Sequence, residues 1–511
     1  MQKARIIIDR DYTISRTDPN LFSSFVEPLG RCIYGGLYEP GHPKADENGF
    51  RQDVLSLIRP LNLTMNRFPG GNYTSTFRWE DSIGPKEKRP RRAEVAWQCI
   101  ETNEFGLNEF ADWSKQNGSD VMMTVNLATR GVLEAMDCIE YCNLEKGTYW
   151  SDLRRSHGYE KPHGYQYWCL SNEIDGPWQV GQNTGAAYGH LAREASKAMK
   201  LIDPSIKTVL AGSSNPFMPT YPEFDEQALD QAWEYIDYLS LHHYISNLKG
   251  DTPNYLAKTL STEQFFKEIS GLFSFIKARK RSTHDVFISF DEFNTWHTVS
   301  GNERMEKPRW GMATSLLEDT YNMEDAVALG AMLITVLRNS DVVKIACMSE
   351  LVNCISHIRT RTGGGCWVLP PYYSFLLYSR YGRGTVLNAR IDSPLYDSTD
   401  YTDVPYLDAV PVLGDDGSLT LFAINRSLTE ELPLEAVLRG FVQEEAGGSS
   451  KKSEKEWSVA DVIVLSHPDP KATNTEENPD EVKPHSGKAA IEDGRLQAVL
   501  PPLSWNVIIL K

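Results

Sequence analysis

The sequence lacks a long hydrophobic run. The longest, ALGAMLITVL at 328–337, is too short to cross a bilayer, for which a helix needs about 20 residues. At the N-terminus, only three apolar residues stand together before Asp9 and Arg10, too few for the core of a signal peptide. We therefore expect a cytoplasmic protein.

Cysteine is scarce and lacks metal-site spacing. The chain has 8 Cys among 511 residues and no CxxC motif. Cys138 and Cys142 have helical i, i+4 spacing, but no second ligand pair lies near them in sequence, unlike the usual zinc motifs. Scattered cysteines in a long chain are typical of free thiols in a reducing compartment. We expect no metal site.

Positive charge is in deficit. The chain has 52 Lys and Arg against 69 Asp and Glu, a formal net charge of −17. Phosphate backbones and anionic membranes bind positive surfaces, so we expect neither nucleic acid nor a membrane as a partner. The net negative charge does not oppose the binding of neutral or cationic ligands.

Between residues 19 and 384, short apolar runs alternate with longer amphipathic segments, as in parallel strands joined by helices. The runs are nearly continuous in hydrophobicity, which indicates strands buried on both faces. Eight of them predict a closed (β/α)8 TIM barrel. An open doubly wound sheet is the alternative, but no GxGxxG or GxxxxGK[ST] motif follows any strand. The expected strands are 25–27, 63–71, 120–131, 165–173, 206–214, 235–244, 286–294 and 342–353, and the expected helices include 106–118, 186–204, 263–281 and 323–341.

After residue 385 the pattern changes to short β-rich runs separated by Pro, Asp and Gly. SLTLFAINRS and PPLSWNVIIL are examples, and this pattern predicts a β-sandwich over 385–511. The opening ARIIIDRDYTIS is also strand-like. We expect residues 1–18 to join that sandwich.

Catalytic groups of a barrel collect where its strands end, so the residues that terminate the eight runs are informative. These positions are rich in acids and amides and contain no metal-ligand spacing such as HExxH. The composition of this set suits a sugar-binding site. Its members are Glu27, Asn72, Asn126, Asn172, Glu173, Ser213, His242, Tyr244, Asp291, Glu292, Glu350 and Asn353.

Two carboxylates on separate strands, Glu173 on the fourth and Glu292 on the seventh, are what cleavage of a glycosidic bond requires. One protonates the leaving oxygen while the other attacks the anomeric carbon or activates water. A separation of about 5 to 5.5 Å supports a covalent intermediate with retention, whereas about 6.5 to 9.5 Å admits water and inverts. A solvated strand end is the alternative reading of either residue alone.

Longer motifs are more specific. NRFPGGNY, WEDSIGPKEKRPRR, ETNEFGLNEF, YWCLSNEIDGPWQVG, FDEFNTW, ENPDEVKP and PPLSWNVIIL resemble the α-L-arabinofuranosidases of glycoside hydrolase family 51, and the similarity runs almost end to end. It implies a barrel plus a sandwich built from both chain ends, exo-acting hydrolysis with retention, no cofactor and often a hexamer. It also implies arabinan, arabinoxylan or derived oligosaccharides as substrates.

The resemblance assigns roles to individual residues. Glu173 in SNEIDGPW is similar to the acid/base of the family and Glu292 in FDEFN to its nucleophile. Tyr244 matches a phenol beside the nucleophile. The resemblance implies further binders of substrate at Glu27, Asn72 and Asn172, which are similar to residues that hold furanose hydroxyls, and at Trp296, a wall of the pocket. We also expect Trp178 and Glu350 to bind substrate.

Three positions depart from the family pattern. Glu350 in SELVN stands where the family generally has Gln, Pro28 replaces a His, and Ser171 replaces a Gly before Asn-Glu. A third carboxyl beside the nucleophile must be protonated or turned away, because otherwise it raises the pKa values of its neighbours. These changes leave open a retaining glycosidase for another linkage, such as a xyloside or glucan. A non-catalytic sugar-binding protein is a third alternative, against which the intact pair of carboxylates weighs.

Alternation along strands predicts the direction of several other side chains. His242 and His243 are adjacent, so they should point to opposite sides, with one a hydrogen-bonded core residue. Asp291 should face away from the pocket that Glu292 faces, holding an Arg or the backbone. We expect Trp79 and Trp97 to belong to the core, because aromatic residues are more often buried than sugar-binding.

Overall fold

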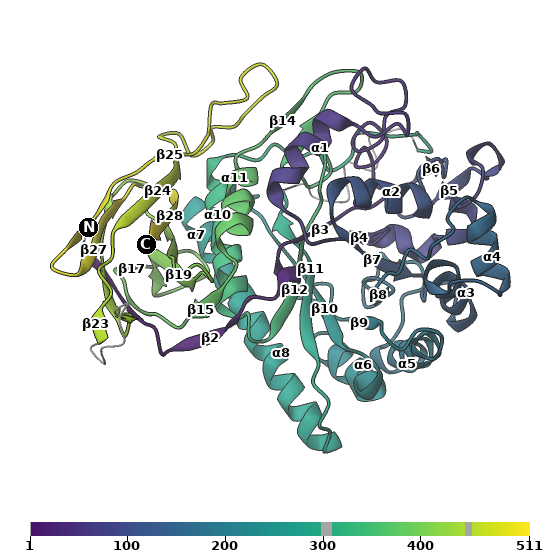
Figure 1. Ribbon diagram of the computed structural model, residues 1–511, viewed down its shortest axis with the longest axis horizontal. Helices are drawn as coiled ribbons and strands as arrows, with labels where there is room; N and C mark the ends of the chain where they lie inside the picture. Colours follow the sequence, from purple (N-terminus) through teal and green to yellow (C-terminus); the bar gives the residue numbers. More distant parts are fainter. Residues whose placement is uncertain (1, 298–308, 445–451) are drawn as a thin grey trace.

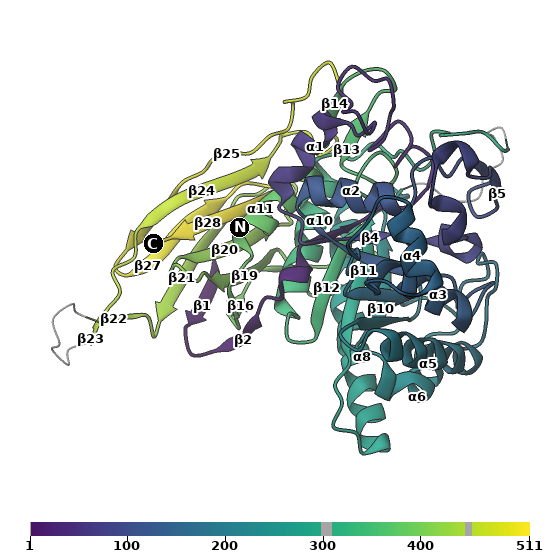
Figure 2. The same ribbon diagram turned by 45° about the vertical axis from the view of Figure 1, so that its right-hand side comes forward.

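The computed structural model describes residues 2–297, 309–444 and 452–511. It consists of a barrel and a β-sandwich that lie side by side, and both chain ends lie in the sandwich (Figure 1). Figure 2, turned by 45°, shows the same separation. None of the described helices has the length and apolar character of a membrane-spanning segment.

The barrel has eight parallel strands that close on themselves in the order β10-β11-β12-β3-β4-β7-β8-β9. Every one of the eight predicted runs contributes one strand, so the TIM barrel is confirmed and the open sheet is excluded. The strands are β3 (Ser23–Phe25), β4 (Met65–Phe68), β7 (Asp120–Val125), β8 (Tyr167–Leu170), β9 (Lys207–Ala211), β10 (Tyr238–Ile245), β11 (Phe287–Thr295) and β12 (Val343–Met348).

Helices surround the barrel (Figure 2). The four that the sequence predicts are α2 (Leu107–Asn117), α5 (Gly185–Ile202), α8 (Thr259–Lys280) and α10 (Met323–Arg338), and the others are α1 (Gln52–Ile58), α3 (Val132–Asn143), α4 (Tyr149–Ser156), α6 (Glu223–Ala232), α7 (Thr252–Ala257) and α11 (Pro371–Tyr381). Cys138 and Cys142 are buried in α3, and all eight cysteines have free thiols. No disulfide therefore links the described parts of the chain.

Helix α10 contains the longest apolar run, and its position explains that run. The helix contacts both the barrel strand β11 and the sandwich strands β19 (Leu407–Leu413), β20 (Leu419–Asn425) and β28 (Ser504–Leu510). Its residues from Met323 to Leu337 are all buried. Gly330 lies against the indole of Trp505 on β28, where an added Cβ would come within 2.5 Å of the ring. A helix that is apolar all round is one buried on every side.

The sandwich consists of a five-stranded and a seven-stranded sheet, in the orders β16-β1-β21-β27-β26 and β2-β15-β19-β20-β28-β24-β25. Strand β1 (Ala4–Asp9) pairs in parallel with β21 (Leu432–Arg439), and β2 (Thr13–Arg16) pairs with β15 (Thr385–Leu387). The remaining strands are β16 (Arg390–Asp392), β24 (Val459–Ser466), β25 (His485–Ser486), β26 (Ala489–Glu492) and β27 (Arg495–Leu500). We propose the domain boundaries 1–18, 19–384 and 385–511.

Short hairpins complete the described strands. One of them, β5 (Arg92–Glu94) with β6 (Cys99–Glu101), follows the barrel strand β4 and carries Trp97 in its turn. The others are β13 (Ile358–Thr360) with β14 (Cys366–Val368), β17 (Leu395–Tyr396) with β18 (Val404–Pro405), and β22 (Val442–Glu444) with β23 (Lys452–Glu454).

Candidate active site

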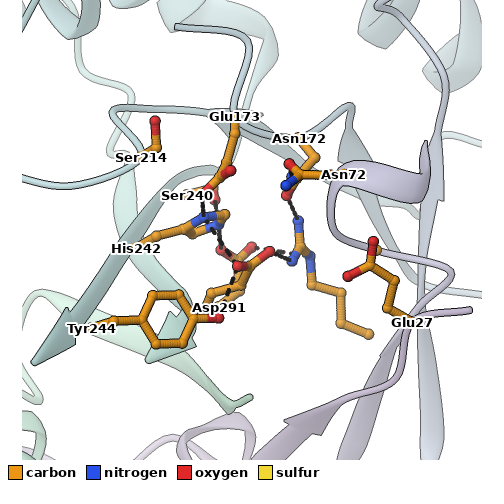
Figure 3. Close-up of polar contacts among 12 residues, drawn as sticks. Glu27, Asn72, Asn172, Glu173, Ser214, Ser240, His242, Tyr244 and Asp291 are labelled. Atoms are coloured by element: carbon orange, nitrogen blue, oxygen red, sulfur yellow. Dashed lines mark hydrogen bonds and ion pairs between the residues drawn. The ribbon is translucent and has the colours of Figure 1, made fainter. Parts of the chain in front are cut away.

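The candidate site lies at the carboxyl-terminal ends of the barrel strands, here called the mouth. Figure 3 shows side chains from several of these strands pointing toward one another. Arg67, in the middle of β4, connects them: it donates to Glu292 Oε1 at 2.7 Å and to Asn172 Oδ1 at 2.6 Å. Its guanidinium is only 1% exposed, so these partners replace the water that a buried charge loses.

Glu292 on β11 is held from two sides. Besides Arg67, the Tyr244 hydroxyl on β10 donates to its Oε2 at 3.0 Å. The residue is 6% exposed. Fixed donors on both oxygens hold the carboxylate in one orientation, as a nucleophile requires.

Glu173 follows β8 on a bend rather than on the strand itself. Ser171 and Glu173 both have positive φ, 81° and 44°, a region that side-chain-bearing residues rarely adopt. The indole N–H of Trp178 donates to Glu173 Oε2 at 2.8 Å. Trp178 is itself 47% exposed, so it fixes the carboxyl with one edge and leaves part of its ring toward solvent.

The two catalytic candidates face each other. A carboxylate oxygen of Glu173, one of Glu292 and a ring nitrogen of His242 all lie within 4.8 Å of one another. Such a trio could hold a metal ion by distance alone. A metal would have to displace the proton of His242, because only a neutral imidazole binds a metal.

His242 on β10 joins three carboxylates. Its Nδ1 lies 3.0 Å from Glu173 and 3.5 Å from Glu292, and its Nε2 lies 3.2 Å from Asp291. Burial lowers the pKa of His242. The negative charges of the three carboxylates and their hydrogen bonds to the imidazole outweigh this effect and raise the pKa to about 10. A buried imidazolium therefore compensates negative charge at the point where the two catalytic candidates meet.

Asp291 contacts an Arg, as expected: Nε of Arg67 lies 3.8 Å from its carboxylate. Its direction differs from the expectation, because it shares Arg67 and His242 with Glu292 and also accepts from Ser240 Oγ at 2.5 Å. The reason is a pair of register shifts, in β10 between Ser240 and His242 and in β11 between Phe290 and Phe293. A bulge redirects the side chains around it. Burial raises the pKa of Asp291, and Arg67 and His242 more than offset this and lower it.

Amide side chains continue the network. Asn172 accepts from Arg67 and donates to Asn72 Oδ1 at 3.2 Å. Asn72 begins the short helix η3 (Asn72–Thr76), which directly follows the PGG turn after β4. Both predicted amide binders, Asn72 and Asn172, therefore belong to the hydrogen-bond network that holds Glu292.

Glu27 follows β3 and is 2% exposed. Its Oε1 accepts from the backbone N–H of Tyr73 and from the indole N–H of Trp97, both at 2.7 Å. Gly71 passes so close that an added Cβ would lie 2.1 Å from Glu27 Oε2. The glycine of the PGG turn is therefore required for this carboxylate to fit.

Glu350 follows β12 and lies beside Glu27. Its Oε2 accepts the backbone N–H of Glu27 at 3.2 Å. Burial raises the pKa of Glu350 well above its usual range. Of the outcomes considered for this third carboxyl, protonation is thus the one that the surroundings favour.

The aromatic candidates have different positions. Trp296 is half-buried directly after β11 and packs edge-on against Tyr244, with ring centroids 5.3 Å apart. Its indole nitrogen has no hydrogen-bond partner among the described residues. Trp79 is a core residue packed on Tyr141 and Trp150, as expected.

Other strand-end residues have structural contacts instead. Asn126 bonds the backbone of residues 75 and 77, and Asn353 bonds the carbonyl of Arg31. Ser213 bonds Asp225. His243 points away from His242 and bonds Thr262, and burial lowers its pKa to about 4. It is the core histidine that the sequence predicts.

Sequence reasoning missed Arg67 and the contact between Trp97 and Glu27. Arg67 stands between Asn66 and Phe68 in a buried strand, and a charged residue there is almost never buried without partners. The position of Arg67 in an apolar strand was therefore the sequence signal that could have identified it as a site residue. Trp97 is buried, as expected of a core residue, but its indole holds Glu27, and only the β5–β6 hairpin brings it there.

A TIM barrel with two facing carboxylates at its mouth defines a glycoside hydrolase. Comparison with known proteins narrows the class. Residues 57–258 match the family described as alpha-L-arabinofuranosidase 1 domain, and residues 291–504 match the alpha-L-arabinofuranosidase C-terminal domain.

Individual relatives match over their full lengths. An intracellular exo-alpha-(1->5)-L-arabinofuranosidase of Bacillus subtilis is 46% identical, covering 100% of this chain and 99% of the relative. Another of Halalkalibacterium halodurans is 46% identical over 99% of both. The solved structure of a family 51 alpha-L-arabinofuranosidase from Bifidobacterium longum has 36% identity and a TM-score of 0.93 over 100% of both chains. The chain belongs to the glycoside hydrolase family 51 α-L-arabinofuranosidases, as the sequence motifs predicted.

Proposed function

We propose that the protein is a retaining, exo-acting α-L-arabinofuranosidase that releases terminal arabinofuranose from arabinan, arabinoxylan or derived oligosaccharides. The observation that carries the proposal is the separation of Glu173 and Glu292, whose nearest ligand atoms lie within 4.8 Å. This short spacing supports a retaining pair, for which about 5 to 5.5 Å is typical, over an inverting pair, for which about 6.5 to 9.5 Å is typical. Full-length similarity to named exo-acting arabinofuranosidases supports the choice of sugar.

In the first step Glu292 attacks the anomeric carbon. A covalent bond forms between them while the glycosidic C–O bond breaks, and Glu173 transfers its proton to the leaving oxygen. Arg67 and Tyr244 hold the attacking carboxylate. Because the anomeric carbon gains positive character as the bond breaks, a fixed anion below it stabilises the transition state.

In the second step Glu173, now ionised, removes a proton from water, which attacks the same carbon and releases Glu292. The new negative charge on Glu173 faces the N–H groups of Trp178 and His242. These donors hold the carboxylate in place between the end of step one and the start of step two.

Substrate contacts follow from the same network. We propose that Glu27, Asn72 and Asn172 bind furanose hydroxyls, with Asn172 at the 2-hydroxyl, where hydrogen bonds strengthen in the transition state. Trp296 forms a wall of the pocket, and the exposed part of Trp178 offers a surface to the sugar that leaves. We also propose that the protein acts in the cytoplasm. A hexamer is the assembly that the family resemblance implies, and light scattering, which measures the mass of the assembly in solution, can test it.

A panel of 4-nitrophenyl glycosides tests the sugar, and NMR of the first product formed tests the stereochemistry. The α-L-arabinofuranoside should be hydrolysed fastest, with α-arabinofuranose appearing before mutarotation. A β product excludes retention, and faster cleavage of a xyloside or glucoside favours a related glycosidase with another linkage. The preferred substrate is then identified by comparing the rates at which the enzyme hydrolyses short arabino-oligosaccharides and decorated xylo-oligosaccharides.

A further inference from the structure

Glu27 and Glu350 form a second pair of buried carboxyls beside the catalytic pair. They are 2% and 1% exposed and follow β3 and β12, which are neighbours in the barrel. The backbone N–H of Glu27 donates to Glu350 Oε2 at 3.2 Å, so the two residues are in direct contact. The charge of Glu350 also raises the pKa of Glu27, so the two buried carboxyls titrate as a unit.

The two members have unequal surroundings. Glu27 accepts two N–H groups at 2.7 Å, from the Tyr73 backbone and the Trp97 indole. Glu350 accepts one backbone N–H at 3.2 Å and a hydrogen bond from the Cys32 thiol. N–H donors favour an ionised acceptor, and a thiol is a weak donor. The difference places negative charge on Glu27 and the proton on Glu350.

The other groups that act on the pair leave this asymmetry to the hydrogen bonds, because Glu292 raises the pKa of Glu27 and of Glu350 alike. Glu292 on β11 adds repulsion, and the neighbouring Cys32 and Cys354 are buried thiols. Arg67 on β4 is the cation that acts on Glu350 among the described residues, but its guanidinium is engaged by Glu292 and Asn172. Burial raises the pKa of both Glu27 and Glu350 well above the usual range.

We propose that Glu350 is a positioning residue that carries the single proton of the Glu27–Glu350 pair, so that Glu27 stays ionised and accepts a hydrogen bond from a furanose hydroxyl. The inference rests on the proposed function of the site. Glu350, which stands where the family generally has Gln, would then act through its ability to gain and lose a proton. When Glu350 loses its proton at high pH, a third negative charge lies beside Glu27 and Glu292 and weakens their hold on the sugar.

Infrared difference spectroscopy of the full chain locates the proton without turnover. The wild type at neutral pH should show the C=O stretch of a buried protonated carboxyl that is missing from Glu350→Gln and retained in Glu27→Gln. Glu134→Gln is the matched control: Glu134 is a buried carboxyl of α3 whose pKa burial raises to about 8, outside the site. It should remove a different band. A band retained in Glu350→Gln, or lost in Glu27→Gln alone, overturns the proposal.

Kinetics provide the second readout. An activated aryl α-L-arabinofuranoside needs no proton for departure, so the alkaline fall of its kcat/KM does not report Glu173. One pH unit above the midpoint of that fall, the wild type should retain about a tenth of its activity. The kcat/KM of Glu350→Gln should fall at a higher pH than that of the wild type. The loss in the wild type should come mainly from a rise in KM. The pH profile of Glu134→Gln should match that of the wild type. Superimposable profiles for wild type and Glu350→Gln contradict the proposal. If the wild type cleaves no arabinofuranoside, the proposed function fails, while the infrared test still stands.

Discussion

The barrel mouth and the sandwich core bury opposite kinds of side chain. At the mouth, Arg67, His242, Asp291 and Glu292 are each less than 10% exposed and have one another as partners. In the core between the two sheets, the buried residues are aliphatic, such as Ile6, Leu434, Leu496 and Ile508. Buried ion pairs contribute little net stability, whereas buried apolar area contributes much. Substitutions at the mouth should therefore change catalysis and, where they leave a buried charge unpaired, stability as well, whereas substitutions around the sandwich should change stability alone.

The largest effect is expected at the nucleophile. Glu292→Ala should lower kcat by more than about 10⁴-fold, because no covalent intermediate can form. The fold should persist, since Arg67 keeps Asp291 and Asn172 as partners. Azide should restore turnover with inverted product, which NMR can detect. Unchanged turnover, or rescue with retained configuration, would remove Glu292 from its assigned role.

Glu173→Ala should act selectively. Poor leaving groups should lose roughly 10²- to 10⁴-fold in kcat/KM, the usual contribution of general acid catalysis, while activated aryl leaving groups lose little because they depart without a proton. A series of aryl arabinofuranosides of graded leaving-group pKa measures this. Equal losses along the series are inconsistent with an acid.

Trp505→Ala tests the other side of the comparison. Trp505 is fully buried, stacks on Phe422 and fills the space beside Gly330 of α10. Its removal should cost about 3 to 5 kcal/mol of unfolding free energy, measured by urea denaturation, with kcat of the folded enzyme unchanged. A large fall in kcat at full folding would show that α10 transmits packing changes to the mouth.

The charge of His242 should make stability depend on pH. Its pKa of about 10 in the folded protein exceeds the unfolded value of about 6.5. The stabilisation is therefore fully present below pH ~6.5 and is lost as pH rises through ~10. Between pH 7 and 10, the wild type should lose more unfolding free energy than His242→Gln, as chemical denaturation at each pH can show. Parallel losses would mean that His242 is neutral in the fold.

The smallest effect is expected at Ser171. Its φ of 81° lies in the left-handed region, and its buried hydroxyl has no partner among the described residues. Ser171→Gly should raise stability by about 1 kcal/mol, because it removes both the strain and the unsatisfied hydroxyl. Thermal unfolding measures the gain, with Ser119→Gly, a residue of normal φ, as the contrast. Equal shifts in both variants would mean that the bend after β8 is unstrained.

The fold was more predictable than the site. All eight barrel strands were found because each is buried on both faces and reads as a continuous apolar run. At the site, Glu173 and Glu292 stand in long motifs, whereas Arg67 is one residue whose partners lie 105 and 225 positions away. Asp291 was misplaced because register shifts in β10 and β11 leave no mark in the composition. The hairpin that carries Trp97 follows from tertiary contacts, which local patterns do not encode.

The pairing of β1 with β21 has a consequence for biosynthesis. Strand β1 pairs with β21 on one side, where Ala4 lies opposite Leu434, and with β16 on the other, where Arg5 lies opposite Asp392. After its synthesis, β1 therefore has no partner in that sheet until β16 has been made. During translation its unpaired edge is open to other chains, a recognised route to aggregation. A chain released by a ribosome that stalls before residue 390 would contain the barrel together with a β1 strand that has no partner in its sheet.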